Sequence, residues 1–315
     1  RGFREPWFLG GTKDVVFWAC ANGDPFDCDN GFATAEQIIM PTEVYAGRSE
    51  SCVRGILGHE LFHHVEFGYV IDGGGSGCAG GFGSTACEGH ARALQDKIYF
   101  DLDLDPAASC VATFRGEVDG YLKNPDRTIW SSSYRSALFW TYLMEQYGSY
   151  RVEPGLGVDF LKNWWELAQT RMSDPSIVDV TNEVIQQYQP GDNVTNAYHD
   201  FTIANLLKDL DLSQVGESFR LRYSYRDEEP VPLRNNLMQF GPVTISQTLN
   251  VPSNGTAASA AITAKRFGGR YIAFDTSSCP AGSTLQFTAT PTALIPLNAN
   301  AQLILPDALH AAFID

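Results

Sequence analysis

The feature that most constrains the fold of this chain is an apolar segment with two histidines and a glutamate in its middle. Residues 53–67 are apolar around most of a helical circumference, and they contain the stretch GHELFHH at 58–64. A helix this apolar must be buried, and each buried polar group that lacks a partner costs roughly 2–7 kcal/mol. The fold must therefore supply partners for these side chains, and a metal ion is the simplest one.

The motif H-E-x-x-H places its two histidines on one face of the predicted helix. Ser49 or Ser51 can cap a helix that runs over about 52–69. Positions i and i+4 lie one above the other on a helix, so the imidazoles of His59 and His63 can reach a single metal ion. Such a pair of histidines predicts a zinc site.

A hydrolytic zinc centre needs a third protein ligand and one open position. Glu60 lies beside the histidines, where it can hold the metal-bound water as a general base. A third histidine in the metzincin pattern would stand at position 69, but the chain has Tyr69 there, and it has Glu66 where that pattern has glycine. We therefore expect the third ligand to come from another helix.

Glu88 is the expected third ligand. It follows a glycine-rich loop at 72–84 and lies near the start of a second predicted helix, 86–99. The loop is long enough to bring this helix back alongside the first one. His90 is a rival third ligand if the segment is not helical, and Arg92, one turn after Glu88, either orients its carboxylate or forms an ordinary ion pair with it.

The combination of HELFH with E-G-x-A-R about 25 residues later resembles the gluzincin zinc metallopeptidases, the thermolysin-like group. The specific match covers about 59–92, and a weaker similarity to secreted bacterial peptidases of the hyicolysin and collagenase type extends over 133–210. The resemblance implies a two-lobed catalytic domain with zinc at the junction of the lobes. It also implies that His59, His63 and Glu88 are the zinc ligands and that Glu60 is the general base. The exopeptidase motif G-x-M-x-N does not occur, which disfavours an aminopeptidase.

Stabilising the oxyanion of such a reaction requires a further hydrogen-bond donor. Tyr134 is the first candidate, because it opens the helix predicted at 133–147, and Tyr121 and His199 are alternatives. Metal-bound histidines also donate their second ring nitrogen to a carboxylate or a carbonyl. Asp96 and Glu117 are candidates for that role, and His64 is expected to pack or to support the ligands.

The pattern along the chain predicts an α+β protein: a small N-terminal sheet, a mostly helical lobe, and a β-rich C-terminal part. We expect two domains, a catalytic domain at 1–212 and an accessory antiparallel β-sandwich at 213–315. The expected strands are 14–19, 36–45, 242–251, 261–275, 284–290 and 301–305. The further expected helices are 157–170, 179–188 and 195–210, while 101–131 is a polar segment that contains proline and aspartate.

Composition narrows the partners and the compartment. With 22 basic and 37 acidic residues the formal charge is -15, which argues against a nucleic-acid binder, and no apolar run reaches the roughly 18 residues of a membrane span. The expected partner is a protein or peptide substrate. Acidic loops at 24–29 and 101–105 are compatible with calcium, and equally with solvated turns.

The cysteines favour an exported protein. Seven are present, and the close pairs Cys20 with Cys28 and Cys78 with Cys87 are expected to form disulfides. Because the total is odd, one thiol is expected to be free or paired with a segment outside this sequence. The Asn-x-Thr triplets at Asn193 and Asn254 agree with export. The chain begins at Arg1 without an initiator methionine, and we expect it to be a mature or trimmed form, or a piece of a longer protein.

The leading hypothesis from the sequence is a secreted zinc-dependent endopeptidase. Two alternatives stay open: a binding or adhesion protein with a non-catalytic zinc site, and a zinc hydrolase that acts on something other than peptides. Glu60 argues against the first of these, because a structural zinc site does not need a carboxylate beside its ligands.

Overall fold

A computed structural model was obtained for the whole chain of 315 residues. The residues that it describes are 14–18, 32–33, 37–41, 49–69, 82–98, 114–151, 155–208, 217–225, 241–256, 258–259, 261, 263, 265–280, 283, 301–305 and 310–314.

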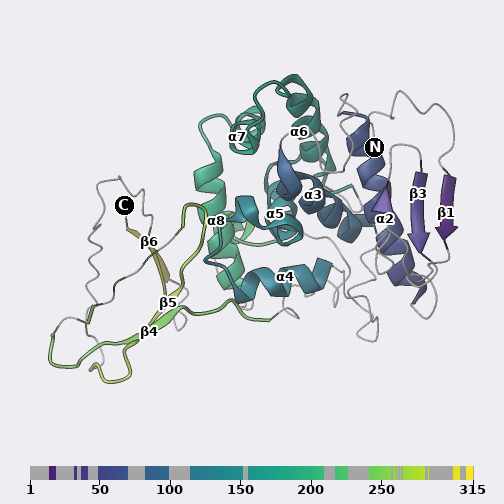
Figure 1. The fold of residues 1–315 in the computed structure, drawn as a ribbon. Coiled ribbons are helices and arrows are strands. Elements are labelled where there is room, and N and C mark those ends of the chain that lie inside the picture. The colour runs from purple at the N-terminus through teal and green to yellow at the C-terminus, as the bar shows by residue number, and fades with distance from the viewer. Residues whose placement is uncertain are drawn as a thin grey trace.

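A small sheet precedes the first helix, as the sequence predicts. It contains β1 (Asp14–Trp18), β2 (Phe32–Ala33) and β3 (Gln37–Pro41) in the order β1-β3-β2, with β1 parallel and β2 antiparallel to β3. Ile38 and Met40 of β3 pack against the first described helix, α2 (Glu50–Phe67), and form a small core with it. This sheet therefore supports one side of α2 (Figure 1).

The helix that carries the histidine motif is α2 (Glu50–Phe67). Ser49 is its N-cap, and the Ser49 hydroxyl accepts a hydrogen bond from the backbone N–H of Cys52. The second predicted helix is α3 (Gly83–Ile98), which packs along α2. Both helices are confirmed, and the histidine motif faces α3 across their interface.

The main hydrophobic core packs against these two helices and is rich in aromatic residues. Its elements are α4 (Phe114–Lys123), η3 (Ile129–Ser131), η4 (Ser133–Ser136), α5 (Ala137–Tyr147), α6 (Val158–Thr170), α7 (Ile177–Tyr188) and α8 (Val194–Leu207). Almost every residue of α5 is buried, and three tryptophans from α5 and α6 are the largest buried side chains. Aromatic rings of this size bury most of the apolar area that holds a domain together.

Two features of this region go beyond the expectations from the sequence. The segment 101–131, for which the sequence indicates only a polar stretch with proline and aspartate, contains α4 and η3, because α4 buries Phe114, Val118 and Tyr121 on one face. The helix expected over 133–147 begins as the separate 3-10 turn η4, since Ser133 has a positive φ of 46° that an α-helix does not allow.

The C-terminal part contains α9 (Glu217–Arg222), β4 (Gln247–Asn250), β5 (Ile272–Asp275), β6 (Ala301–Leu305) and β7 (His310–Ile314). β4 and β5 pair in parallel, whereas β6 and β7 are antiparallel. The architecture is α+β, but the described strands do not establish the expected β-sandwich. The strand expected over 284–290 lies outside the described residues.

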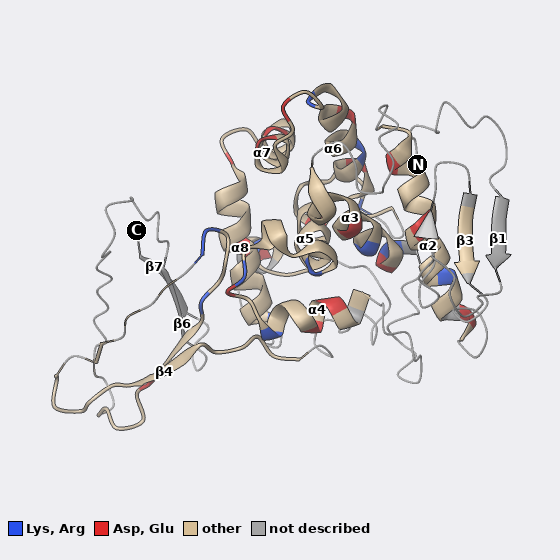
Figure 2. Ribbon diagram, viewed as in Figure 1, with Lys and Arg blue, Asp and Glu red and all other residues tan. Residues whose placement is uncertain are grey.

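Charged side chains are distributed over many elements. Acidic residues lie on α2, α4 and α7 among others, while the segment beside α8 carries several basic ones (Figure 2). In the described part of the chain, no helix combines the length and the apolarity that a bilayer span requires.

Candidate metal centre

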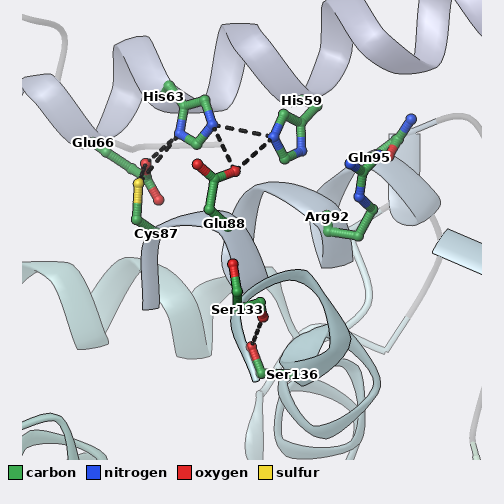
Figure 3. A network of polar contacts seen from close by, with 9 residues as sticks. All are labelled: His59, His63, Glu66, Cys87, Glu88, Arg92, Gln95, Ser133 and Ser136. Carbon is green, nitrogen blue, oxygen red and sulfur yellow. Dashed lines mark hydrogen bonds and ion pairs between the residues drawn. The ribbon is translucent and has the colours of Figure 1, made fainter. Parts of the chain in front are cut away.

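The two histidines of the motif point to the same spot beside α3 (Figure 3). His59 and His63 are one helical turn apart on α2, and their Nε2 atoms lie 3.1 Å apart. His59 is buried, and the side chain of His63 is 12% exposed. The spacing of four residues therefore brings the two imidazoles together, as the sequence predicts.

Glu88 comes from the first half of α3 and meets both imidazoles. Its Oε2 atom is 3.1 Å from Nε2 of His59 and 3.4 Å from Nε2 of His63. The three atoms form a compact triangle, with Glu88 the most exposed of the three side chains at 18%. The structure thus brings together the three residues that the sequence nominated as ligands.

The contact between His63 and Glu66 favours a tautomer that suits a cation. Oε2 of Glu66 lies 2.7 Å from Nδ1 of His63 and accepts a hydrogen bond from Nδ1–H, so loss of the proton on Nε2, which metal binding requires, leaves a lone pair that faces Glu88. Three electron-rich atoms this close need a metal ion or a proton between them. Tetrahedral zinc with bonds of about 2.0–2.2 Å keeps neighbouring ligand atoms about 3.3–3.6 Å apart, so the residues fit zinc with only small shifts.

The pKa values of the three side chains reflect the same convergence. Burial lowers the pKa of His59 to about 3, which keeps its ring neutral at physiological pH. Burial opposes charge on His63 too, but the carboxylates of Glu66 and Glu88 outweigh it and hold that pKa well above its ordinary value. Burial would raise the pKa of Glu88, yet its hydrogen bonds with the two histidines hold it far below the usual range. Glu88 is therefore a carboxylate, as a metal ligand must be.

A second group of potential ligands lies behind His63. Its members are His63, Glu66 and Cys87, and the sulfur of Cys87 is 3.0 Å from Oε2 of Glu66. Cys87 is disulfide-bonded, so it offers no thiolate to a metal. This leaves the triangle of His59, His63 and Glu88 as the better site of the two.

Glu60 is buried beside the triangle, on the same helix. Its negative charge contributes to the raised pKa of Tyr134 and opposes the burial that lowers the pKa of Arg92, so its carboxylate lies within electrostatic range of both side chains. Because Glu60 follows His59 directly, its side chain projects about 100° around the helix from the ligand face. It is thus beside the ligands rather than among them.

Tyr134 borders the triangle, whereas the alternatives to it do not. The Tyr134 ring lies 5.7 Å from that of His59, and its hydroxyl is hydrogen-bonded to Glu88. Burial, with the charge of Glu88 added, raises the pKa of Tyr134 far above its ordinary value, so the phenol keeps its proton. Tyr121 instead pairs with Tyr198 through the two hydroxyls, and His199 lies beside Asp200.

Arg92 packs on Tyr134. Its guanidinium carbon lies 4.9 Å from the centre of the Tyr134 ring, and it also donates to Gln95. Burial lowers the pKa of Arg92, while Tyr134 and Glu117, followed by Glu88, act in the opposite direction. Arg92 therefore helps to fix the ring that faces the site.

Gly89 explains how η4 comes so close to Glu88. A Cβ atom at this position would lie 2.1 Å from Oγ of Ser136 and 2.8 Å from the indole nitrogen of Trp140. Both of these groups donate to the carbonyl of Thr85 over 2.9 Å, which binds η4 and α5 to the first turns of α3. The glycine after Glu88 thus lets Tyr134 reach the site.

His90 and His64 are packing residues. His90 is fully buried and packs edge-on against Trp140, Trp164 and Trp165, where burial holds its pKa well below the ordinary value. His64 packs against Phe67. Within the described residues, His90 joins neither group of potential ligands, so its role as a rival ligand finds no support.

Glu66 is the site residue that sequence reasoning missed. Asp96 and Glu117 were the expected partners of the histidines, but Glu66 accepts the bond from His63, and Glu117 pairs with Arg135. The signal was available, because residues three apart on a helix are neighbours. Glu66 stands where the metzincin pattern has glycine, and that mismatch says nothing about its contact with His63.

The cysteines and acidic loops are described only in part. Cys52 and Cys87 are disulfide-bonded, and Cys279 is free. The expected pairs Cys20–Cys28 and Cys78–Cys87 each include cysteines outside the described residues, so both pairings stay predictions. The loops considered for calcium, 24–29 and 101–105, also lie outside them.

Comparisons with known proteins return no match. No family model, no curated protein and no solved structure is similar to this chain at a significant level. The class of protein must therefore be argued from the site.

Proposed function

We propose that this protein is a zinc-dependent endopeptidase. The observation that carries the proposal is the triangle of His59 Nε2, His63 Nε2 and Glu88 Oε2, with sides of 3.1, 3.1 and 3.4 Å. Three protein ligands with one side open are the pattern of catalytic zinc sites, whereas structural sites are closed by four. The buried Glu60 beside the triangle favours hydrolysis over a structural role.

In this proposal each residue of the site has a distinct task. His59, His63 and Glu88 hold the zinc ion, and Glu66 fixes the ring orientation of His63. When bound, zinc would acidify a water ligand toward a pKa of roughly 7 and polarise the scissile carbonyl. Glu60 accepts the proton of the attacking water and passes it to the leaving amine.

Tyr134 is the proposed donor to the oxyanion. Its phenol is protonated at neutral pH, borders the ligands and is stacked on Arg92, so it has only to exchange its hydrogen bond to Glu88 for one to the oxyanion. A preorganised donor of this kind typically contributes about 10²–10³-fold to the rate.

The finer features of the proposal rest on the sequence. The resemblance to the gluzincins implies a two-lobed catalytic unit and a peptide substrate, the cysteines favour secretion, and the alternating pattern of the C-terminal part favours an accessory β-sandwich. The disulfide-bonded state of Cys52 and Cys87 supports an oxidising compartment.

Metal analysis combined with digestion of a peptide library tests the proposal against its alternatives. One zinc per chain with internal cleavage of peptides supports it. Zinc without any turnover would indicate a binding protein, and turnover of small esters or amides alone would indicate a different zinc hydrolase. Either of these results would overturn the assignment as an endopeptidase.

The variant Glu60→Gln separates metal binding from catalysis. We expect it to retain zinc and to lose about 10²–10⁴-fold in kcat, because the amide cannot accept a proton. Glu50→Gln, an exposed position on the same helix, is the matched control and should leave both properties unchanged. Undiminished hydrolysis by Glu60→Gln would exclude the proposed base.

A further inference from the structure

A segment from the C-terminal part of the chain is hydrogen-bonded to the helical core. This segment, here called the strap, comprises residues 241–246 and 265–271. Backbone N–H groups of Gly241 and Thr244 donate to Asp119 Oδ1 and the Leu122 carbonyl of α4, both over 2.9 Å. Three further core contacts of the strap are Gly269 N–H to the Pro125 carbonyl, Arg270 to Asp126, and Tyr271 hydroxyl to the Thr202 carbonyl. The strap is thus part of the same packed body as α4 and α8.

Charge and shape agree with this attachment. The strap is basic, and Arg270 lies 2.9 Å from Asp126 in the turn that follows α4, a helix with acidic residues (Figure 2). At Gly268 a Cβ atom would lie 2.5 Å from the carbonyl oxygen of Asp126, so only glycine allows this approach.

Phe267 is the part of the strap that enters the core. Its ring is 9% exposed and packs edge-on against Trp130 and Tyr198, with 5.5 Å between ring centres in both cases. Its carbonyl accepts the N–H of Ile129 over 2.9 Å, which is the first residue of η3. Side chain and backbone of Phe267 therefore both hold η3.

The turn that Phe267 holds leads directly to Tyr134. Tyr134 is five positions after Ile129, and hydrogen bonds to the carbonyls of Thr128 and Ser132 connect the two 3-10 turns. Among the described residues, the non-glycine ones with a positive φ are Ser133 at 46° and Phe267 at 55°. Ser133 directly precedes Tyr134 in η4, and Phe267 contacts the start of η3, the turn before it. Such backbone conformations persist only where their surroundings hold them, and they cluster at functional sites.

We infer that Phe267 is a positioning residue for Tyr134, and that the strap belongs to the catalytic unit. This inference rests on the proposed function, in which Tyr134 donates to the oxyanion. Phe267 does not touch the metal ligands. It holds η3 and η4 against α3, and thereby the Tyr134 ring beside His59.

The test uses the full-length chain with Phe267→Ala, its conservative partner Phe267→Leu, and Phe160→Ala as the matched control. Phe160 is fully buried but packs against Tyr147 and Tyr188, away from η3. We expect Phe267→Ala to keep one zinc per chain and an unchanged KM, and to lose about tenfold or more in kcat. Phe267→Leu should recover most of that loss, and Phe160→Ala should keep kcat within about threefold.

Coupling to Tyr134 is the decisive measurement. In the Tyr134→Phe background, Phe267→Ala should change kcat by less than about threefold, because the group that it positions is already gone. Equal loss in both backgrounds, or unchanged kcat in Phe267→Ala, would overturn the inference.

Hydrogen exchange provides a readout that needs no activity. Amide exchange over 129–136 should accelerate in Phe267→Ala and stay unchanged in Phe160→Ala. If the wild-type protein hydrolyses no peptide, the proposed function fails, but exchange still reports whether Phe267 holds the turn. If the wild type is active and exchange over 129–136 is unaffected, the inference alone fails.

Discussion

At the scale of single residues, the site depends on how each polar group is partnered. His63 serves two neighbours, because one ring nitrogen donates to Glu66 and the other faces Glu88 and His59. A carboxylate on the outer nitrogen fixes the tautomer and raises the basicity of the inner one. Glu66 is thus as much a part of the proposed site as a direct ligand.

We expect Glu66→Gln to weaken zinc binding by about 10–100-fold, the usual effect of losing such an outer carboxylate. The amide oxygen still accepts a hydrogen bond, but it carries no charge to favour the proton on Nδ1. Competition with a chelator measures the affinity directly.

Glu166→Gln is a suitable comparison for that experiment, since Glu166 pairs with Lys162 on the surface of α6. It should bind zinc as the wild type does. An affinity of Glu66→Gln equal to that of the wild type would show that His63 is oriented by something else.

At the scale of elements, the close approach of η4 to α3 decides whether Tyr134 can reach the ligands. Gly89 provides the room, and the carbonyl of Thr85 accepts hydrogen bonds from both Ser136 and Trp140. A buried ion pair between Lys97 and Glu145, at 2.7 Å, joins the far end of α3 to α5. Both ends of α3 are therefore bound to η4 and α5, and Tyr134 is part of η4.

The substitution Gly89→Ala should disturb this contact. Its methyl group would overlap backbone-anchored side chains, and overpacking of this kind typically costs about 1–3 kcal/mol of unfolding free energy. We also expect kcat to fall, since η4 must move away from Glu88. Urea unfolding and steady-state kinetics measure the two effects.

Ser84→Ala, at an exposed position in the first turn of α3, should change the unfolding free energy by less than about 0.5 kcal/mol. A Gly89→Ala protein as stable and as active as this control would mean that the interface tolerates the extra methyl group.

At the scale of the whole molecule, burial of charge makes stability depend on pH. Asp200 on α8 is 4% exposed and accepts a bond from Arg222 of α9 over 2.7 Å. Burial raises its pKa to about 6, although Arg222 acts in the opposite direction. The folded protein therefore holds this proton more tightly than the unfolded chain, whose aspartates have a pKa near 3.9.

The sign of the pH effect follows from that difference. As the pH rises from about 4 to 6.5, the unfolded state gives up the proton first, so Asp200 makes folding less favourable by up to about 3 kcal/mol. Asp200→Asn lacks this titration. We expect its unfolding free energy, relative to the wild type, to increase across this pH range, as measured by urea unfolding at several pH values.

Asp126→Asn, which alters an exposed ion pair with Arg270, should show a small and nearly constant difference over the same range. A difference between Asp200→Asn and the wild type that does not change with pH would contradict the assignment.

Local patterns account for what could be predicted from the sequence. The cap at Ser49, the helices α2 and α3, and the shared face of His59 and His63 depend on neighbours within a few residues. Such features follow from helix geometry, whatever the rest of the chain does. Only the partner across the interface, Glu88, required the further assumption that the glycine-rich loop returns the chain to α2.

What the tertiary structure alone decided are the contacts between distant segments. Helix geometry allows the contact between Glu66 and His63, but the folded chain alone decides that Nε2 of His63 faces Glu88 and His59. The helix α4 and the hold of Phe267 on η3 depend on core surfaces that the chain assembles from separate elements. Periodicity in the sequence indicates which face of an element is apolar. The surface that covers this face depends on how the whole chain packs. The sequence therefore determined the helix that carries His59 and His63, but not the turn that brings Tyr134 to it.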